Sequence, residues 1–115
     1  MKIFILAAMM VIWPFVAEAA SNVLTWADNS TNEALFNIER KAEACTGTGA
    51  FAEIVTVTAN VTTFNDALVT EGLTYCYRVR ATNAAGSSAY SNTASRTVPF
   101  TVPVAPSGLG VTGGP

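Results

Sequence analysis

Apolar and polar residues alternate over short runs along most of the chain, and after residue 19 no stretch repeats with the period of a helix. Clusters of Asn, Asp, Gly, Ser and Pro separate these runs, as turns between strands do. The runs that predict β-strands are "NVLTWAD" (22–28), "LFNIERK" (35–41), "FAEIVTVTA" (51–59), "VTTFNDA" (61–67), "LTYCYRVRAT" (73–82) and "AYSNTASRTV" (89–98).

The run 73–82 shows the alternation most clearly. Tyr75, Tyr77 and Val79 share one face, whereas Cys76 and Arg78 share the other. A single antiparallel sheet would leave such a face of aromatic residues in water, so the pattern predicts two packed sheets. The inward residues expected from the runs 22–28 and 35–41 are Leu24, Trp26, Phe36 and Ile38, with Glu39 facing outward.

The first nineteen residues differ from the rest of the chain. They carry one basic residue, Lys2, then an unbroken apolar run (3–13), and they end in Ala17-Glu18-Ala19. This layout is typical of a secretory signal peptide cleaved after Ala19. The apolar run is shorter than the roughly 20 residues of a membrane-spanning helix, although an uncleaved anchor stays open. We therefore predict a secreted or cell-surface protein with no membrane span after cleavage.

The sequence contains only two cysteines, Cys45 and Cys76, and no histidine. Export brings the chain into an oxidising compartment, where one disulfide between them is expected. Closing a loop of about thirty residues stabilises a small domain by roughly 3–4 kcal/mol in the chain-entropy model. Without histidine or a second thiol pair, no metal site and no cofactor are predicted.

Charge and candidate chemistry narrow the function further. A net charge of −2 gives no electrostatic basis for binding nucleic acid. Catalytic triads built on imidazole are excluded, and the carboxylates are scattered over turns and outward positions, so we predict no enzyme activity. The loop 27–33 gathers Asp28, Asn29, Asn32 and Glu33, but its spacing fits a turn better than a calcium loop. Tyr90 is the one expected surface aromatic, a weak platform for carbohydrate.

Two long segments, "LTWADNSTNEALFNIERK" (24–41) and "TTFNDALVTEGLTYCYRVRATNAAGSSAYSN" (62–92), resemble a bacterial-type fibronectin type III domain. The resemblance covers residues 22–98 and implies an all-β, immunoglobulin-like β-sandwich of about seven strands. It also implies that Trp26, Leu73 and Tyr75 belong to the core and to a tyrosine corner, with Leu68 as the apolar plug of the preceding turn. Cys45 and Cys76 would lie on or beside neighbouring strands, and their bridge would then staple the surface.

The family pattern includes a first strand that is not found ahead of residue 22. Family members begin with a strand of the form Ala-Pro-x-x-Leu-x-x-Thr ahead of the "LTW" strand, and no such strand separates the predicted signal from "SNVLTW". The C-terminal "APSGLGVT" (105–112) has that form instead. The expected organisation is a signal peptide (1–19), a domain without its first strand (20–98), and a linker with a strand-like segment (99–115). The residues expected to fill such a strand position are Ala105, Pro106, Leu109 and Val111.

Three explanations of the tail remain open at the level of sequence. The tail could fill a neighbouring subunit, begin a second domain of a longer protein, or return to its own domain. The return is barely possible, because the nine residue steps from Val98 to Ser107 span at most ~30 Å in total when fully extended. The first predicts a head-to-tail structural subunit, such as an extracellular filament, whose partners are copies of itself or other fibronectin type III-like subunits. The alternative function is a non-catalytic accessory or adhesion module, or a fragment of a multidomain surface protein or polysaccharide-degrading enzyme.

Overall fold

The computed structural model describes residues 19–115, so the predicted signal peptide lies outside the described residues except for Ala19. The described residues contain no helix long and apolar enough to cross a bilayer. Their strands are β1 (Asn22–Thr25), β2 (Leu35–Lys41), β3 (Ala52–Thr58), β4 (Thr63–Asp66), β5 (Thr74–Asn83), β6 (Gly86–Ser87) and β7 (Ala94–Thr97).

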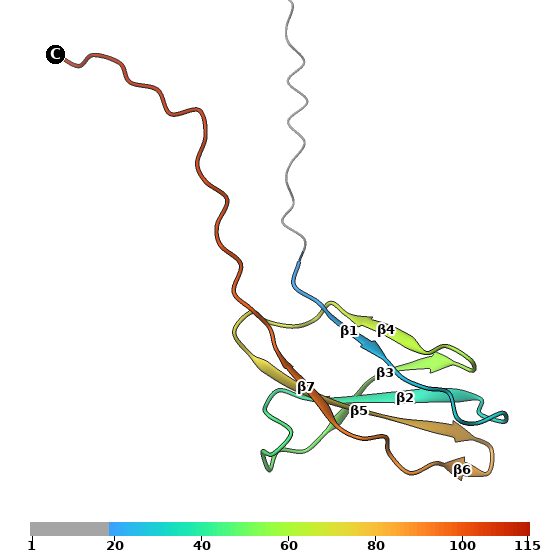
Figure 1. Cartoon of the computed structure of the whole chain (residues 1–115). Helices are drawn as coiled ribbons and strands as arrows, with labels where there is room; N and C mark the ends of the chain where they lie inside the picture. Colours follow the sequence, from blue (N-terminus) through green and yellow to red (C-terminus); the bar gives the residue numbers. More distant parts are fainter. Residues whose placement is uncertain (1–18) are drawn as a thin grey trace, which may run out of the picture.

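The strands form two antiparallel sheets that face each other (Figure 1). One sheet contains only β1 and β4, and the other has the order β3-β2-β5, with β6 and β7 both pairing along the far edge of β5. This arrangement confirms the predicted all-β sandwich of about seven strands.

The core lies between the two layers. It comprises Phe36 and Ile38 from β2, Tyr75, Tyr77 and Val79 from β5, and Val98 after β7. Leu24 and Trp26 reach it from the small sheet and are partly buried, and the rings of Trp26 and Phe36 meet edge to face at 5.7 Å. The period-two pattern of β2 and β5 therefore placed the inward faces correctly.

Two apolar residues with predicted packing roles are exposed: Leu68, the predicted plug of the turn, and Leu73, the predicted core residue. Leu68 is 84% exposed, and Val69 packs against the core in its place. The Leu68 N–H donates to Asp66 Oδ1 in a local turn, which directs the Leu68 side chain outward. Leu73 directly precedes β5 and is 45% exposed.

The last predicted strand, 89–98, is shorter than expected. Only Ala94–Thr97 pairs with β5 as a regular strand. In the segment before it, two N–H groups of β5 donate to serine hydroxyls and not to main-chain carbonyls. Val79 N–H donates to Ser91 Oγ, and Ala81 N–H donates to Ser88 Oγ. These hydroxyls hold the irregular segment against β5, and sequence periodicity does not reveal them.

The outer face of the large sheet carries the Cys45–Cys76 disulfide. Cys76 faces away from Tyr75 as predicted, yet it is fully buried because the loop between β2 and β3 covers it. Beside it, the Arg78 guanidinium is sandwiched between the rings of Phe51 and Tyr90 at 4.1 and 3.7 Å.

Glu39 lies on this same outer face and is 7% exposed, not solvated as its outward position predicts. Its carboxylate accepts hydrogen bonds from Arg78 and from the Tyr90 hydroxyl. Burial opposes ionisation of this group, but these two donors outweigh burial and lower the pKa of Glu39.

Candidate strand-docking groove

A groove of about 560 Å³ runs along the side of the sandwich where β1 and β7 lie opposite each other. Leu24 and Trp26 line one wall, Ala94 lies on the other, and Tyr77 and Val79 of β5 line the groove between them. The groove therefore opens directly onto the apolar core between the two layers.

The wall formed by β1 has a free strand edge. Trp26 N–H donates to Thr62 O at 3.1 Å. Because backbone groups alternate in direction along a strand, those of Leu24 and Asn22 also point toward β4. The N–H and C=O groups of Val23 and Thr25 consequently point away from β4. Among the described strands β1 pairs with β4 alone, so this edge has no partner strand.

The opposite wall, β7, has a second free edge. Val98 N–H donates to Leu73 O at 2.9 Å, and the same alternation directs Arg96 and Ala94 toward β5. The backbone groups of Ser95 and Thr97 therefore point away from β5, on the side of the groove. Within residues 19–115, β7 pairs only with β5.

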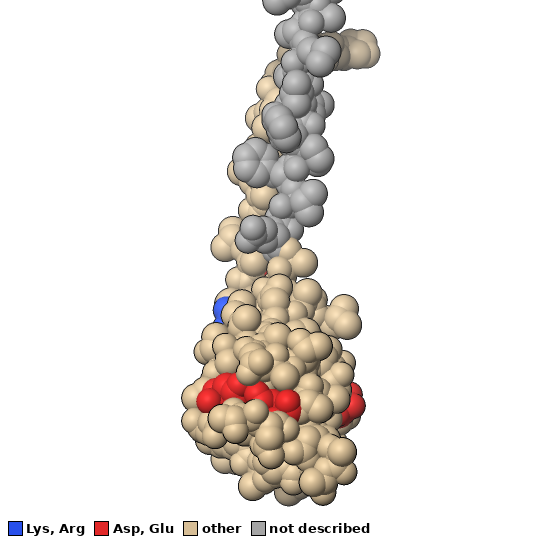
Figure 2. All heavy atoms as spheres, turned by 90° about the vertical axis from the view of Figure 1, so that its right-hand side faces the viewer, with Lys and Arg blue, Asp and Glu red and all other residues tan. Residues whose placement is uncertain are grey.

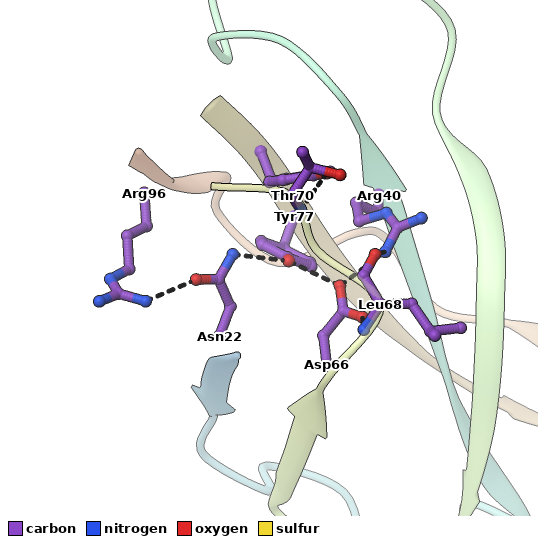
Figure 3. Close-up of polar contacts among 8 residues, drawn as sticks. Asn22, Arg40, Asp66, Leu68, Thr70, Tyr77 and Arg96 are labelled. Atoms are coloured by element: carbon purple, nitrogen blue, oxygen red, sulfur yellow. Dashed lines mark hydrogen bonds and ion pairs between the residues drawn. The ribbon is translucent and has the colours of Figure 1, made fainter. Parts of the chain in front are cut away.

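One end of the groove is closed by a side chain that crosses it. Arg96 is opposite the inward-facing Tyr75, so its side chain points between the layers. Its guanidinium donates to Asn22 Oδ1 at 2.7 Å (Figure 3). It also donates to Ser21 O at 2.9 Å, and the two bonds join β7 to the start of β1.

A buried polar network continues from this bridge into the core (Figure 3). Asn22 Nδ2 donates to the Tyr77 hydroxyl at 2.9 Å, and that hydroxyl donates to Asp66 Oδ2 at 2.7 Å. Arg40 also donates to Asp66 Oδ2, at 2.8 Å. The network thus ties β1 and β4 of the small sheet to β2 and β5 of the large one.

The pKa values of Tyr77 and Asp66 agree with a protonated hydroxyl donating to an ionised carboxylate. Burial raises the pKa of Tyr77 to about 12, with Asp66 adding to the rise against the hydrogen bond from Asn22. Tyr77 is therefore a protonated donor at neutral pH. Burial opposes ionisation of Asp66 as well, but hydrogen bonds from Arg40, Tyr77 and the Leu68 N–H hold the pKa of Asp66 below its usual range.

The other end of the groove is lined by Ala27, Asn29, Ser91 and Asn92. Among the described residues, no hydrogen bond joins the two walls at this end, in contrast to the Arg96 bridge. The groove is therefore open here and closed at the other end.

The adjoining loop between β1 and β2 is acidic. Ser30 Oγ donates to Glu33 and, with other hydrogen bonds, lowers the pKa of Glu33 to about 2, whereas the pKa of Asp28 is raised by its interaction with Glu33. Figure 2 shows acidic side chains across the middle of this side of the molecule, with a basic side chain at its edge and mostly uncharged residues around them. Within the described part of the chain, no group of three or more acidic, Cys or His side chains is arranged to hold a metal ion.

The C-terminal segment leaves the sandwich at the pole where β7 ends and extends away from it (Figure 1). Its first residues are attached: the Phe100 ring lies against Gly72, and Thr101 donates to Glu71 through its hydroxyl at 2.6 Å. Gly72 has φ +82°, and a side chain there would collide with the Phe100 ring, so this approach requires glycine.

The four residues predicted to act as a strand are in the extended part of this segment. Ala105, Pro106, Leu109 and Val111 are all exposed, Leu109 by 95%, and the structure does not bring them to the groove. The segment 98–115 contains no strand. The strand position beside β1 and the strand-like segment therefore coexist unpaired in one chain.

The remaining predicted residues occupy other parts of the fold. The Thr70 N–H donates to the Tyr75 hydroxyl at 2.9 Å, the bond expected of a tyrosine corner. Trp26 lines the groove, and the disulfide lies on the outer face of the large sheet. Sequence reasoning missed Asn22, Ala94 and Arg96, since their roles depend on contacts between distant strands that no local pattern announces.

Comparison with known proteins bears on the fold. No protein-family model matches the sequence, and a search of curated proteins finds no match. Among solved structures, the chain is similar to the sixth fibronectin type III domain of human fibronectin type III domain containing protein 3. That likeness has a TM-score of 0.59 and 15% identity, over 79% of this chain and 83% of that domain.

Two further structures agree. One is a myokine (TM-score 0.55, 19% identity), over 72% of this chain and 86% of that one. The other is the twitchin kinase region from C. elegans (TM-score 0.58, 19% identity), where 70% of this chain matches 14% of a much longer chain. The protein thus has a fibronectin type III-like fold, as the sequence resemblance predicts.

Proposed function

We propose that this protein is an extracellular, non-enzymatic structural subunit that assembles head to tail, with the C-terminal segment of one copy filling the groove of the next. One observation carries the proposal: a groove with an unpaired strand edge and an exposed, unpaired strand-like segment occur in the same chain. An added strand would satisfy the free backbone groups and cover the open core.

The segment has the alternating pattern and the uncharged composition that a strand in this groove requires. Leu109 and Val111 lie two residues apart, so they share one face of an extended strand, and Gly110 and Thr112 lie on the other. Fully burying each of these apolar side chains is worth about 1.5–3 kcal/mol, part of which offsets the ordering of the segment. The residues from 105 onward include no charged side chain to bury.

The start of the tail favours donation to another copy. Phe100 and Thr101 are held against Gly72 and Glu71, in the turn before β5, and the chain continues outward from there. A return to its own groove would require releasing these contacts and reversing direction. Donation in trans keeps them.

The donor side is tested with the full-length chain and the double variant Leu109→Asp/Val111→Asp. Two carboxylates cannot enter an apolar groove without large desolvation costs, so we expect this variant to be monomeric where the wild type forms oligomers. The measurement is molar mass in solution by light scattering over a concentration series. The control Val102→Asp/Val104→Asp places the same charges in the exposed linker and should assemble like the wild type.

The recipient side is tested by Val23→Pro. Proline removes the N–H that faces the groove and leaves the N–H groups that pair β1 with β4, as tolerated on an edge strand. We expect a folded but monomeric chain. A wild-type protein that stays monomeric at high concentration contradicts the proposal, and if it is also retained on polysaccharides or cell surfaces, an accessory binding module is supported instead.

A further inference from the structure

We infer that the docked segment lies between both free edges and runs antiparallel to β1 and parallel to β7, entering at the end lined by Ala27 and Asn29. This inference rests on the proposed function and adds the direction of the strand. The direction matters because it decides between an open chain of subunits and a closed, reciprocally exchanged dimer.

The two edges face the same groove from different sheets. Val23 and Thr25 offer free backbone groups from β1, and Ser95 and Thr97 offer them from β7. A strand has two edges of its own, so one inserted segment can pair with β1 on one side and with β7 on the other. Such a strand would join the two layers along their open side.

The side chains of the two walls leave room in the middle of the groove and block one end. Ala94, the inward residue at the start of β7, is small and lies opposite Tyr77. Two residues later Arg96 crosses to Ser21 and Asn22. A segment entering past Arg96 would break these hydrogen bonds, whereas entry past Ala27 and Asn29 breaks none between the walls.

Entry at the open end sets the direction of the strand. β1 runs from the Arg96 end of the groove toward the open end, and β7 runs the opposite way. A segment that enters at the open end and ends near Arg96 is therefore antiparallel to β1 and parallel to β7.

The same choice determines the assembly. The tail of a donor leaves at the pole where β7 ends, which is the Arg96 end of its own groove. If it entered a partner at that partner's Arg96 end, like poles would meet and two copies could exchange tails in a closed dimer. Entry at the open end brings unlike poles together, and this contact continues from subunit to subunit.

The test is disulfide trapping between full-length chains. One cysteine is placed on β1, as Val23→Cys or Thr25→Cys, and the other in the tail, as Gly108→Cys, Gly110→Cys or Thr112→Cys. The three tail positions would share the outward face of the docked strand. Cross-links formed under mild oxidation are read on non-reducing gels and located by mass spectrometry. Val23→Cys with Val104→Cys in the linker measures random collisions, and peptide mapping verifies that Cys45–Cys76 stays intact.

Direction is read from the order of the cross-links. In an antiparallel strand Val23 lies beside a later tail position than Thr25 does, for example Val23 beside 112 and Thr25 beside 110. The reversed pairs, Val23 with 110 and Thr25 with 112, should then cross-link no more than the linker control. The opposite order overturns this inference and the head-to-tail direction of assembly, but the docking of the tail in the groove of another copy still stands. Links confined within one chain, or none above the control, overturn both.

Arg96 has its own test. In Arg96→Ala the closed end opens, so we expect reversed cross-links and a new population of dimers beside the longer oligomers. Thr58→Ala, at an exposed position at the end of β3 and away from the groove, is the control and should behave as the wild type. Unchanged direction in Arg96→Ala would show that the bridge does not select it.

Discussion

At the scale of single residues, Asp66 on β4 links the small sheet to two strands of the large sheet. It is 3% exposed, and it accepts hydrogen bonds from Arg40 on β2 and Tyr77 on β5. An ionised carboxylate this deeply buried is stable only while these donors are in place. The same donors keep the Asn22 end of the groove in position through Tyr77.

Replacing Asp66 by Asn should therefore destabilise the fold and change its response to acid. Hydrogen bonds to charged groups contribute about 1.5–3 kcal/mol, and we expect a loss of that order in the free energy of unfolding at pH 7. A carboxyl whose pKa is lowered by folding stabilises fully above its unfolded pKa of about 4, and this contribution is lost as the pH falls through the folded pKa.

The measurement is urea unfolding from pH 7 down to pH 2. The wild type should lose stability below about pH 4, and Asp66→Asn, less stable at pH 7, should lose less over the same range. Glu53→Gln removes a carboxylate from an exposed position on β3 but keeps a carbonyl oxygen that can accept from Asn37, so the stability at pH 7 should change little. Parallel curves for the wild type and Asp66→Asn would show that Asp66 is not the linked group.

Sequence reasoning has limits at this scale that Asp66 and Leu68 illustrate. A period-two pattern assigns inward and outward faces, but it cannot identify a buried carboxylate whose donors lie 26 and 11 residues away. In the turn after β4, two adjacent apolar residues compete for one inward position, and the hydrogen bond from the Leu68 N–H to Asp66 decides in favour of Val69.

At the scale of elements, regular strands were predictable because each has one face against the core. The residues predicted for β2 (35–41) match the observed strand, and β5 is displaced by one residue. Prediction fails where side chains replace backbone partners, as in the segment before β7. It also missed the burial of Cys76, because the covering loop is a tertiary feature.

The loop between β2 and β3 gives the element-scale prediction. It is held by Cys45–Cys76 and by Lys41, whose ammonium group donates to Cys45 O and Gly47 O. Reducing the disulfide should lower the free energy of unfolding by roughly 3–4 kcal/mol, measured by denaturant midpoints with and without reductant. The double variant Cys45→Ala/Cys76→Ala should be insensitive to reductant.

Assembly should survive this change at protein concentrations and temperatures where the reduced chain remains folded. The bridge lies on the outer face of the large sheet, and the groove opens between the layers on the side of β1 and β7. Oligomers that dissociate on reduction while the fold persists would show that the outer face, and not the groove, holds the copies together.

At the scale of the whole molecule, the predicted contact is heterologous, because a tail on one copy meets a groove on another. Only the two copies at the ends of an oligomer keep an unused element, a groove at one end and a tail at the other. Such a contact propagates unless it closes into a ring. The donated part of the tail carries no charge, so the strength of assembly should depend little on salt.

This geometry makes a prediction about mixtures of variants. Leu109→Asp/Val111→Asp keeps a working groove but has no working tail, and Val23→Pro keeps the tail but has a blocked groove. Each variant alone should be monomeric. Mixed in equal amounts they should form a pair of twice the subunit mass and nothing larger, because the complex has no further working tail facing a working groove.

Light scattering and native mass spectrometry measure the masses of the mixed species. Either variant added to the wild type should also shorten the wild-type oligomers, because the tail-defective variant blocks further growth at a free tail and Val23→Pro blocks it at a free groove. Replacing the tail variant by Val102→Asp/Val104→Asp, which keeps both tail and groove, should restore longer species. If the two defective variants stay monomeric together, each defect acts on folding or on another surface, and the contact between tail and groove is not the one that joins the copies.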